Sequence, residues 1–105
     1  MGPIRTHIEI SKGMILCRPR DGHVRARQLA ELEWLSDDEE FTLSFMLLGG
    51  RSAWPFREPQ PATFDPTHTF RGSLLEVTPT AEPPAYKYTV RIGGKLLDPI
   101  IIVDR

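Results

Sequence analysis

Hydrophobic and polar residues alternate over several short stretches of the chain. Between residues 4 and 10, isoleucine and threonine hold the even positions, while Arg5, His7 and Glu9 hold the odd ones. Residues 85–92 show the same period of two. Since successive side chains of a strand point to opposite faces of a sheet, this pattern predicts half-buried β-strands.

Turn-forming residues separate these stretches and set the number of strands. Glycine, proline, serine and aspartate gather at residues 11–13 and 19–22, and a glycine pair stands at 93–94. The final run, residues 99–103, is apolar at consecutive positions, which predicts an interior strand. We therefore predict an all-β fold, in which residues 1–105 form a single Greek-key β-sandwich domain of about seven strands.

Residues 25–35 carry two competing signals. Arginine, glutamine, leucine, alanine and glutamate, which favour a helix, are abundant there. However, the apolar side chains in and just before this stretch keep to even positions: Val24, Ala26, Ala30, Leu32 and Trp34. The alternation favours a strand, then a turn at residues 36–38, then a strand over residues 41–45 whose three apolar side chains share a face.

The stretch from residue 49 to residue 71 breaks the alternation. It contains four prolines and four aromatic residues, so a central strand is not expected there. Because aromatic and arginine side chains are enriched in interface hot spots, we predict a candidate interaction surface. Its residues are Arg51, Trp54, Phe56, Arg57 and Phe64. The partner would be an unknown protein or a second copy of the chain. In the alternative interpretation, Trp54 and Phe56 merely close one end of the sandwich.

The charge balance argues against nucleic acid and anionic membranes as partners. The formal net charge is −1 and the basic residues are scattered, so no positive patch is expected. The densest basic group consists of Arg18, Arg20, Arg25 and Arg27. Asp21 lies within this group, and we interpret it as a solvated face rather than an anion-binding patch.

Targeting signals and disulfide chemistry are not evident in the chain as given. No apolar run approaches the ~18 residues of a membrane span, and no signal peptide is apparent, which predicts a cytoplasmic protein or else a mature form or fragment whose signal is missing. Cys17 is the single cysteine, so an intramolecular disulfide cannot form.

The order of these segments resembles the cupredoxin-like β-sandwich. An alternating first strand is followed by LEWLSDDEEFTLSF, residues 32–45, where those proteins have a strand, an Asn- or Asp-rich turn and another strand. A proline- and aromatic-containing middle, the strand AYKYTV and a hydrophobic last strand complete the pattern. Residues 34–38 and 98–103 are similar to the Trp-x-Ser-x-Asp turn and the Asp-Pro-hydrophobic run of bacterial cupredoxin-like domains of unassigned function.

The resemblance implies a position for a blue-copper site, which needs two histidines, a cysteine thiolate and a weak axial ligand. One histidine is expected after the acidic turn, but residues 39–42 read EEFT. The other ligands are expected in the closing loop, but residues 90–95 read VRIGGK. Motifs for a nucleophile elbow, a phosphate loop or a zinc protease are also missing. We predict no copper site, no cofactor and no enzymatic activity, and instead a protein-interaction or structural module.

Two further functions are kept as alternatives. Tyr86 and Tyr88, followed by the glycine pair, resemble one edge of some carbohydrate-binding β-sandwiches, although both tyrosines share a face with the apolar Val90 and Ile92. Cys17 offers a soft ligand or a thiol, which allows redox or metal handling.

Overall fold

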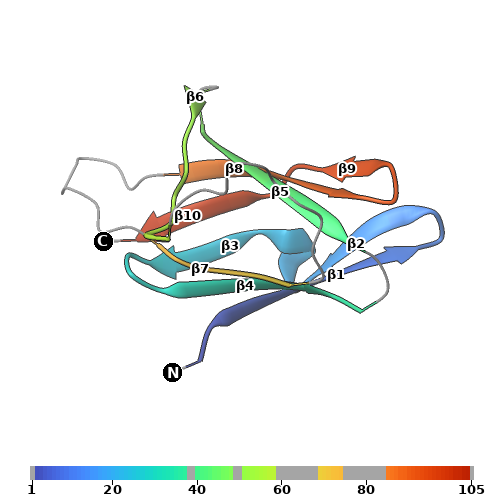
Figure 1. The fold of residues 1–105 in the computed structure, drawn as a ribbon, viewed down its shortest axis with the longest axis horizontal. Helices are drawn as coiled ribbons and strands as arrows, with labels where there is room; N and C mark the ends of the chain where they lie inside the picture. Colours follow the sequence, from blue (N-terminus) through green and yellow to red (C-terminus); the bar gives the residue numbers. More distant parts are fainter. Residues whose placement is uncertain (1, 38–39, 49–50, 59–68, 75–84, 105) are drawn as a thin grey trace.

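The computed structural model describes residues 2–37, 40–48, 51–58, 69–74 and 85–104, and these residues form an all-β sandwich. Two mixed sheets pack face to face, with the apolar side chains of both sheets between them (Figure 1). The fold class predicted from the alternation is therefore confirmed. Its cause is the period of two, which gives nearly every strand one apolar face to bury.

The first sheet has four strands, ordered β2 (Met14–Arg18), β1 (Ile4–Ser11), β4 (Glu31–Ser36) and β7 (Thr69–Ser73). β1 pairs antiparallel with β2 and parallel with β4, and β4 pairs antiparallel with β7. The register places Thr6 opposite Trp34, and both side chains are buried. This row of the sheet therefore faces the core.

The outer face of the first sheet is covered by ion pairs between neighbouring strands. Arg5 Nε lies 2.8 Å from Glu33 Oε1, and Arg71 Nε lies 2.8 Å from Glu31 Oε2. Arg18 forms a further pair with a glutamate of β1. Such exposed pairs contribute little stability each, but they keep this face in contact with water.

The second sheet contains the last strand of the chain in its interior. Its order is β3 (Val24–Arg27), β10 (Ile100–Asp104), β8 (Ala85–Ile92), β5 (Phe41–Leu47) and β6 (Arg51–Ser52), with β9 (Lys95–Leu97) pairing with β8. β10 runs parallel to β3 and antiparallel to β8, which confirms the predicted interior strand. The three apolar side chains of residues 41–45 are all buried, as predicted.

Residues 14–35 cross between the two sheets twice. β2 belongs to the first sheet, the 3-10 helix η1 (Arg20–Gly22) makes the crossing, and β3 belongs to the second sheet. The chain then returns through a turn in which Ala30 N donates a hydrogen bond to Arg27 O, at 3.2 Å. The single strand predicted over residues 24–35 is thus wrong in one respect. It is two strands in different sheets, because Leu29 adopts a left-handed backbone with φ of 70° and reverses the chain.

Two-residue turns join β1 to β2 in the first sheet and β8 to β9 in the second. Gly93 and Gly94 join β8 to β9 with φ values of 56° and 75°, so both central residues have the positive φ of a type I′ turn. β9 and β10 then follow the same strand in one register, since Val90 pairs with Leu97 and Lys87 with Ile100. The glycine pair therefore turns the chain back along β8.

The segment between residues 49 and 71 contains more strand than the sequence predicts. β6 pairs with β5, and β7 begins at Thr69, inside the predicted connection. Leu74 follows β7 and forms an isolated bridge with Phe56. The expected seven strands therefore become ten short ones among the described residues.

Aromatic side chains fill the centre of the sandwich. The Trp34 ring is fully buried, with its centroid 5.2 Å from that of Tyr88 and 6.0 Å from those of three phenylalanines. Most of these contacts are edge-to-face or tilted, which is the favoured geometry of aromatic pairs. Trp34 therefore connects the first sheet to the second across the core.

Gly22 is the closest point of contact between η1 and the core. The Tyr88 hydroxyl donates a hydrogen bond to the Gly22 carbonyl oxygen inside the protein. A Cβ on Gly22 would lie 2.9 Å from Pro99 Cγ and 3.0 Å from both Cys17 Cβ and the Tyr88 hydroxyl oxygen. Only glycine fits here, since its φ is also +85°.

We predict that Gly22→Ala is much more destabilising than Gly13→Ala. Both glycines have positive φ, but a Cβ on Gly13 would meet nothing within 4 Å. Gly13→Ala should therefore lose only the backbone term of about 1 kcal/mol. Gly22→Ala should lose a further ~1–3 kcal/mol through overpacking. Urea unfolding of both variants measures the difference, and equal losses would contradict the packing around Gly22.

Candidate functional site

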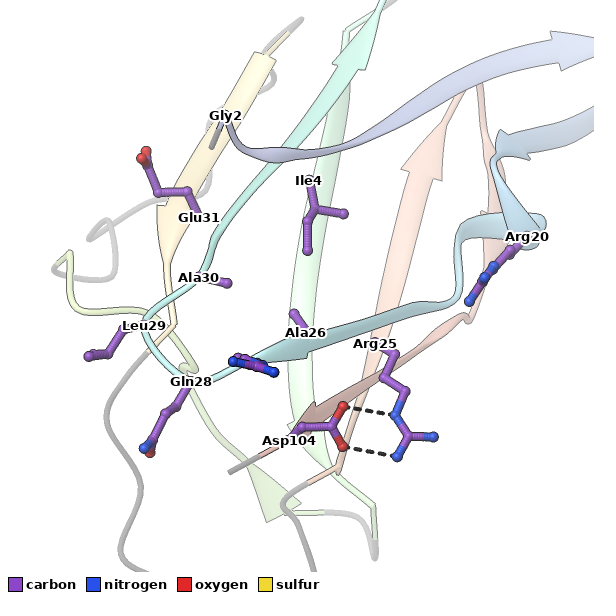
Figure 2. Close-up of a pocket in the computed structure, with 11 residues that line it drawn as sticks. Gly2, Ile4, Arg20, Arg25, Ala26, Gln28, Leu29, Ala30, Glu31 and Asp104 are labelled. Atoms are coloured by element: carbon purple, nitrogen blue, oxygen red, sulfur yellow. Dashed lines mark hydrogen bonds and ion pairs between the residues drawn. The ribbon is translucent and has the colours of Figure 1, made fainter.

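An open groove lies where the chain crosses between the sheets. Its volume is about 720 Å³, and it is bordered by the start of β1, by η1, by β3 and by the turn before β4. Figure 2 shows Ile4 and Ala26 pointing into the space between β1 and β3. Together with Ala30 they give the groove an apolar floor. The groove exists because β2 pairs only with residues 7–11 of β1, so residues 4–6 have a strand on one side only.

Three arginines surround this floor. Arg20 comes from η1, and Arg25 and Arg27 come from β3, where their odd positions alternate with the buried Val24 and Ala26. All three arginines are exposed. Apolar walls lower the local dielectric, so an anion in the groove would interact with these guanidinium groups more strongly than on an open surface.

The two carboxylates of the groove are already engaged by arginines. Arg25 donates two hydrogen bonds to Asp104, at 2.8 and 3.0 Å, as Figure 2 shows. These bonds, with the nearby charges of Arg25 and Arg27, hold the pKa of Asp104 below its usual value. Glu31 accepts a hydrogen bond from Arg71 Nε at 2.8 Å. Arg20 and Arg27 form no ion pair with any residue that the structure describes, so the groove carries an excess of positive charge.

Backbone strain gathers around the same groove. Four non-glycine residues have positive φ among the described residues, namely Lys12, Arg20, Asp21 and Leu29. Lys12 belongs to a hairpin turn, but Arg20 and Leu29 line the groove and Asp21 follows Arg20. Left-handed backbone in such residues costs of order 1–3 kcal/mol and is enriched at functional sites. The strain marks this groove as the candidate site.

The predicted solvated face of four arginines agrees with the structure, because all four side chains are exposed. Arg18 pairs with Glu9 at 3.1 Å on the outer face of the first sheet, in agreement with that prediction. Arg20, Arg25 and Arg27 are exposed and also line the groove. The sequence offers one signal, the alternation of arginine with small buried residues in β3. It offers none for Ile4, which tertiary pairing brings to the groove.

The candidate interaction surface around residue 54 divides into buried and exposed parts. Phe56 is only 2% exposed, so its side chain belongs to the core and this part of the predicted surface is corrected. Trp54 is half-buried and Arg57 is exposed. Arg51 lies in β6, and Phe64 falls outside the described residues. For Arg51, Trp54 and Arg57 the interaction surface stays a prediction.

Trp54 is held by contacts within the protein. Its ring packs edge-on against Phe45, Phe56 and Phe70, with centroids 5.3 to 5.7 Å apart. The indole N–H donates a hydrogen bond to the Glu58 backbone oxygen at 2.5 Å. The Ser73 amide donates to Glu58 Oε1 at 2.8 Å and helps to hold the pKa of Glu58 below its usual value. These contacts favour the alternative interpretation, in which this loop closes one end of the sandwich.

We predict that Phe56→Ala lowers the free energy of unfolding by about 3–5 kcal/mol, because it empties a fully packed site. Arg57→Ala, its exposed neighbour, should change it by less than ~0.5 kcal/mol. Urea unfolding measures both values.

Light scattering on Trp54→Ala should give the same mass as the wild type. A wild-type oligomer that becomes a monomer in Trp54→Ala would instead establish a self-association surface.

The residues behind the two alternative functions are buried. Tyr86 and Tyr88 are 8% and 0% exposed, so neither ring is available to stack on a sugar. Cys17 is 2% exposed. Within the described residues, no three histidine, cysteine or acidic side chains lie together as metal ligands would. Carbohydrate binding and redox or metal handling through Cys17 therefore stay predictions, and the side chains on which they were based are not accessible to a ligand.

We predict that Cys17 reacts slowly with iodoacetamide in the folded protein. Burial, aided by the negative charge of Asp21, raises the pKa of the thiol to about 11. The folded state thus favours the neutral thiol. The stability that the neutral thiol contributes to the folded state is fully present below the unfolded pKa near 9, and it is lost as the pH rises towards 11. Alkylation at pH 8 followed by mass spectrometry should show slow modification that urea accelerates strongly. Equal rates with and without urea would contradict the burial.

No helix in the described part of the chain has the length and apolar character needed to cross a membrane. No model of a known protein family matches the chain, and neither a curated protein nor a solved structure matches it significantly.

Proposed function

We propose that the protein is a non-catalytic interaction module on a copper-free, cupredoxin-like sandwich, and that it binds an acidic segment of a partner protein. The observation that carries the proposal is the groove beside β3. There Arg20 and Arg27, which form no ion pair among the described residues, line the same groove as the apolar Ile4, Ala26 and Ala30. A cytoplasmic location is part of the same proposal.

The strand arrangement supports the β-sandwich part of the proposal. The first and last strands each have one parallel and one antiparallel neighbour, and residues 14–27 divide between the two sheets. The closing loop, where the resemblance places copper ligands, is the tight Gly93-Gly94 turn. In this proposal, the ligand binds in the groove and not at the closing loop.

The chemistry of the groove favours carboxylates. A guanidinium group donates paired hydrogen bonds that match the two oxygens of a carboxylate, as Arg25 already does for Asp104. Arg20 and Arg27 offer the same donors to an incoming ligand. The apolar floor offers contact to uncharged side chains between the acidic ones. An acidic peptide meets both demands.

We predict that a fluorescein-labelled hexapeptide of alternating glutamate and valine binds saturably, and that a lysine–valine peptide does not. Fluorescence anisotropy at increasing salt should show weakening affinity, because exposed charges are screened. The double variant Arg20→Ala, Arg27→Ala should weaken binding by about fivefold or more, consistent with two exposed ion pairs.

The matched control for this experiment is Arg91→Ala. Arg91 is exposed on β8 beside the Gly93-Gly94 turn and does not line the groove. The Arg91→Ala variant removes one positive charge, compared with two in the double variant, and should leave affinity unchanged. Binding that is equal in the double variant and the wild type, or equal for both peptides, would refute the proposed function.

A further inference from the structure

β3 has an open edge at the groove. It is the outermost strand of the second sheet, and β10 is its single neighbour among the described strands. Figure 2 shows β10 on one side of β3 and the Ile4 side chain on the other. The edge of β3 that faces away from β10 therefore borders the groove.

The hydrogen bonds around β3 show which backbone groups face this edge. Gln28 N donates to Asp104 O at 3.0 Å, so the even-numbered residues of this strand direct their backbone groups towards β10. In a parallel ladder the alternate residues point the other way. Two contacts agree: Arg27 O accepts from Ala30 N, and His23 N donates to Arg20 O. The N–H groups of Arg25 and Arg27 thus point towards the groove.

We propose that the acidic segment binds as an extra strand on the free edge of β3, an inference that rests on the proposed function. A strand added here continues the second sheet. Its side chains would alternate between the two faces of that sheet. Those on the inner face would meet Ile4 and Ala26, and those on the outer face would meet Arg25 and Arg27. The partner segment is therefore an extended stretch in which acidic and small apolar residues alternate.

Charge selects this occupant over a second copy of the chain. Two β3 strands placed edge to edge would bring four arginine side chains together, and like charges opposite each other on paired strands are unfavourable. An acidic strand would instead place negative side chains opposite the arginines, which is favourable. Charged side chains also guard edge strands against unspecific pairing, which leaves this edge open to a segment of opposite charge.

Selective N-methylation of the glutamate–valine peptide tests the strand addition. One peptide is methylated at the glutamate amides and the other at the valine amides, with equal charge and composition. Only one set of amides can face β3, so one peptide should lose at least tenfold in affinity while the other stays within about threefold of the parent. Losses that are equal in both peptides, or missing from both, overturn the strand addition even when the parent peptide binds.

Hydrogen exchange gives a second measurement on the intact protein. With bound parent peptide, the amides of Arg25 and Arg27 should exchange at least tenfold more slowly, while the Ala26 amide, already directed towards β10, should change little. Parent binding without this protection overturns strand addition and leaves the proposed function standing. Failure of the parent peptide to bind defeats the proposed function itself. A peptide-free dimer that protects the same amides would identify a second copy as the occupant and overturn the inference.

Discussion

The packing of Gly22 against Cys17, Tyr88 and Pro99 determines where the chain leaves the first sheet and enters the second. These four residues come from β2, from η1, from β8 and from the residue before β10. The Tyr88 hydroxyl satisfies the Gly22 carbonyl inside the protein, where an unpaired acceptor would be costly. The contact holds η1 against the core, while the ladder with β10 holds β3 in the second sheet.

The groove follows from that crossing. β2 ends its pairing with β1 at His7, so the first residues of β1 keep an open edge on the side where β3 passes. The side chains of Val24 and Ala26 point from β3 into the core between the two sheets, and the small Ala26 side chain leaves room below Ile4. The left-handed backbone of Leu29 then returns the chain to β4. A change in sheet membership thus creates a groove, and the arginines of β3 give it positive charge.

Much of the sandwich could be predicted from the period of two, because burial of one face of a strand is visible in a single sequence. The division of residues 24–35 into two strands of different sheets could not be predicted in this way. Ala26 and Leu32 both hold even positions, so the alternation passes through the turn without a change of phase. The left-handed Leu29 carries no mark in the sequence, since glycine or asparagine usually fills such a position.

The burial of Phe56 was hidden for a different reason. It lies among prolines, with no periodic pattern around it, and its site is made by Gly72 on β7. A Cβ on Gly72 would come within 2.7 Å of the Phe56 ring, so the glycine makes room for the phenylalanine. Such complementarity between distant residues is a property of the folded chain. The groove shares this property, because Ile4 and Arg20 line it together only in the folded chain.

The central claim is that residues 14–18 and 24–27 lie in different sheets, which leaves the edge of β3 open. Nuclear Overhauser contacts between backbone protons in uniformly labelled protein test it most directly. Contacts should join Ala26 to Val103 and Ile8 to Cys17, as the two ladders require. Backbone contacts between residues 24–27 and residues 4–6 would contradict the claim, because β3 would then continue the first sheet and close the groove.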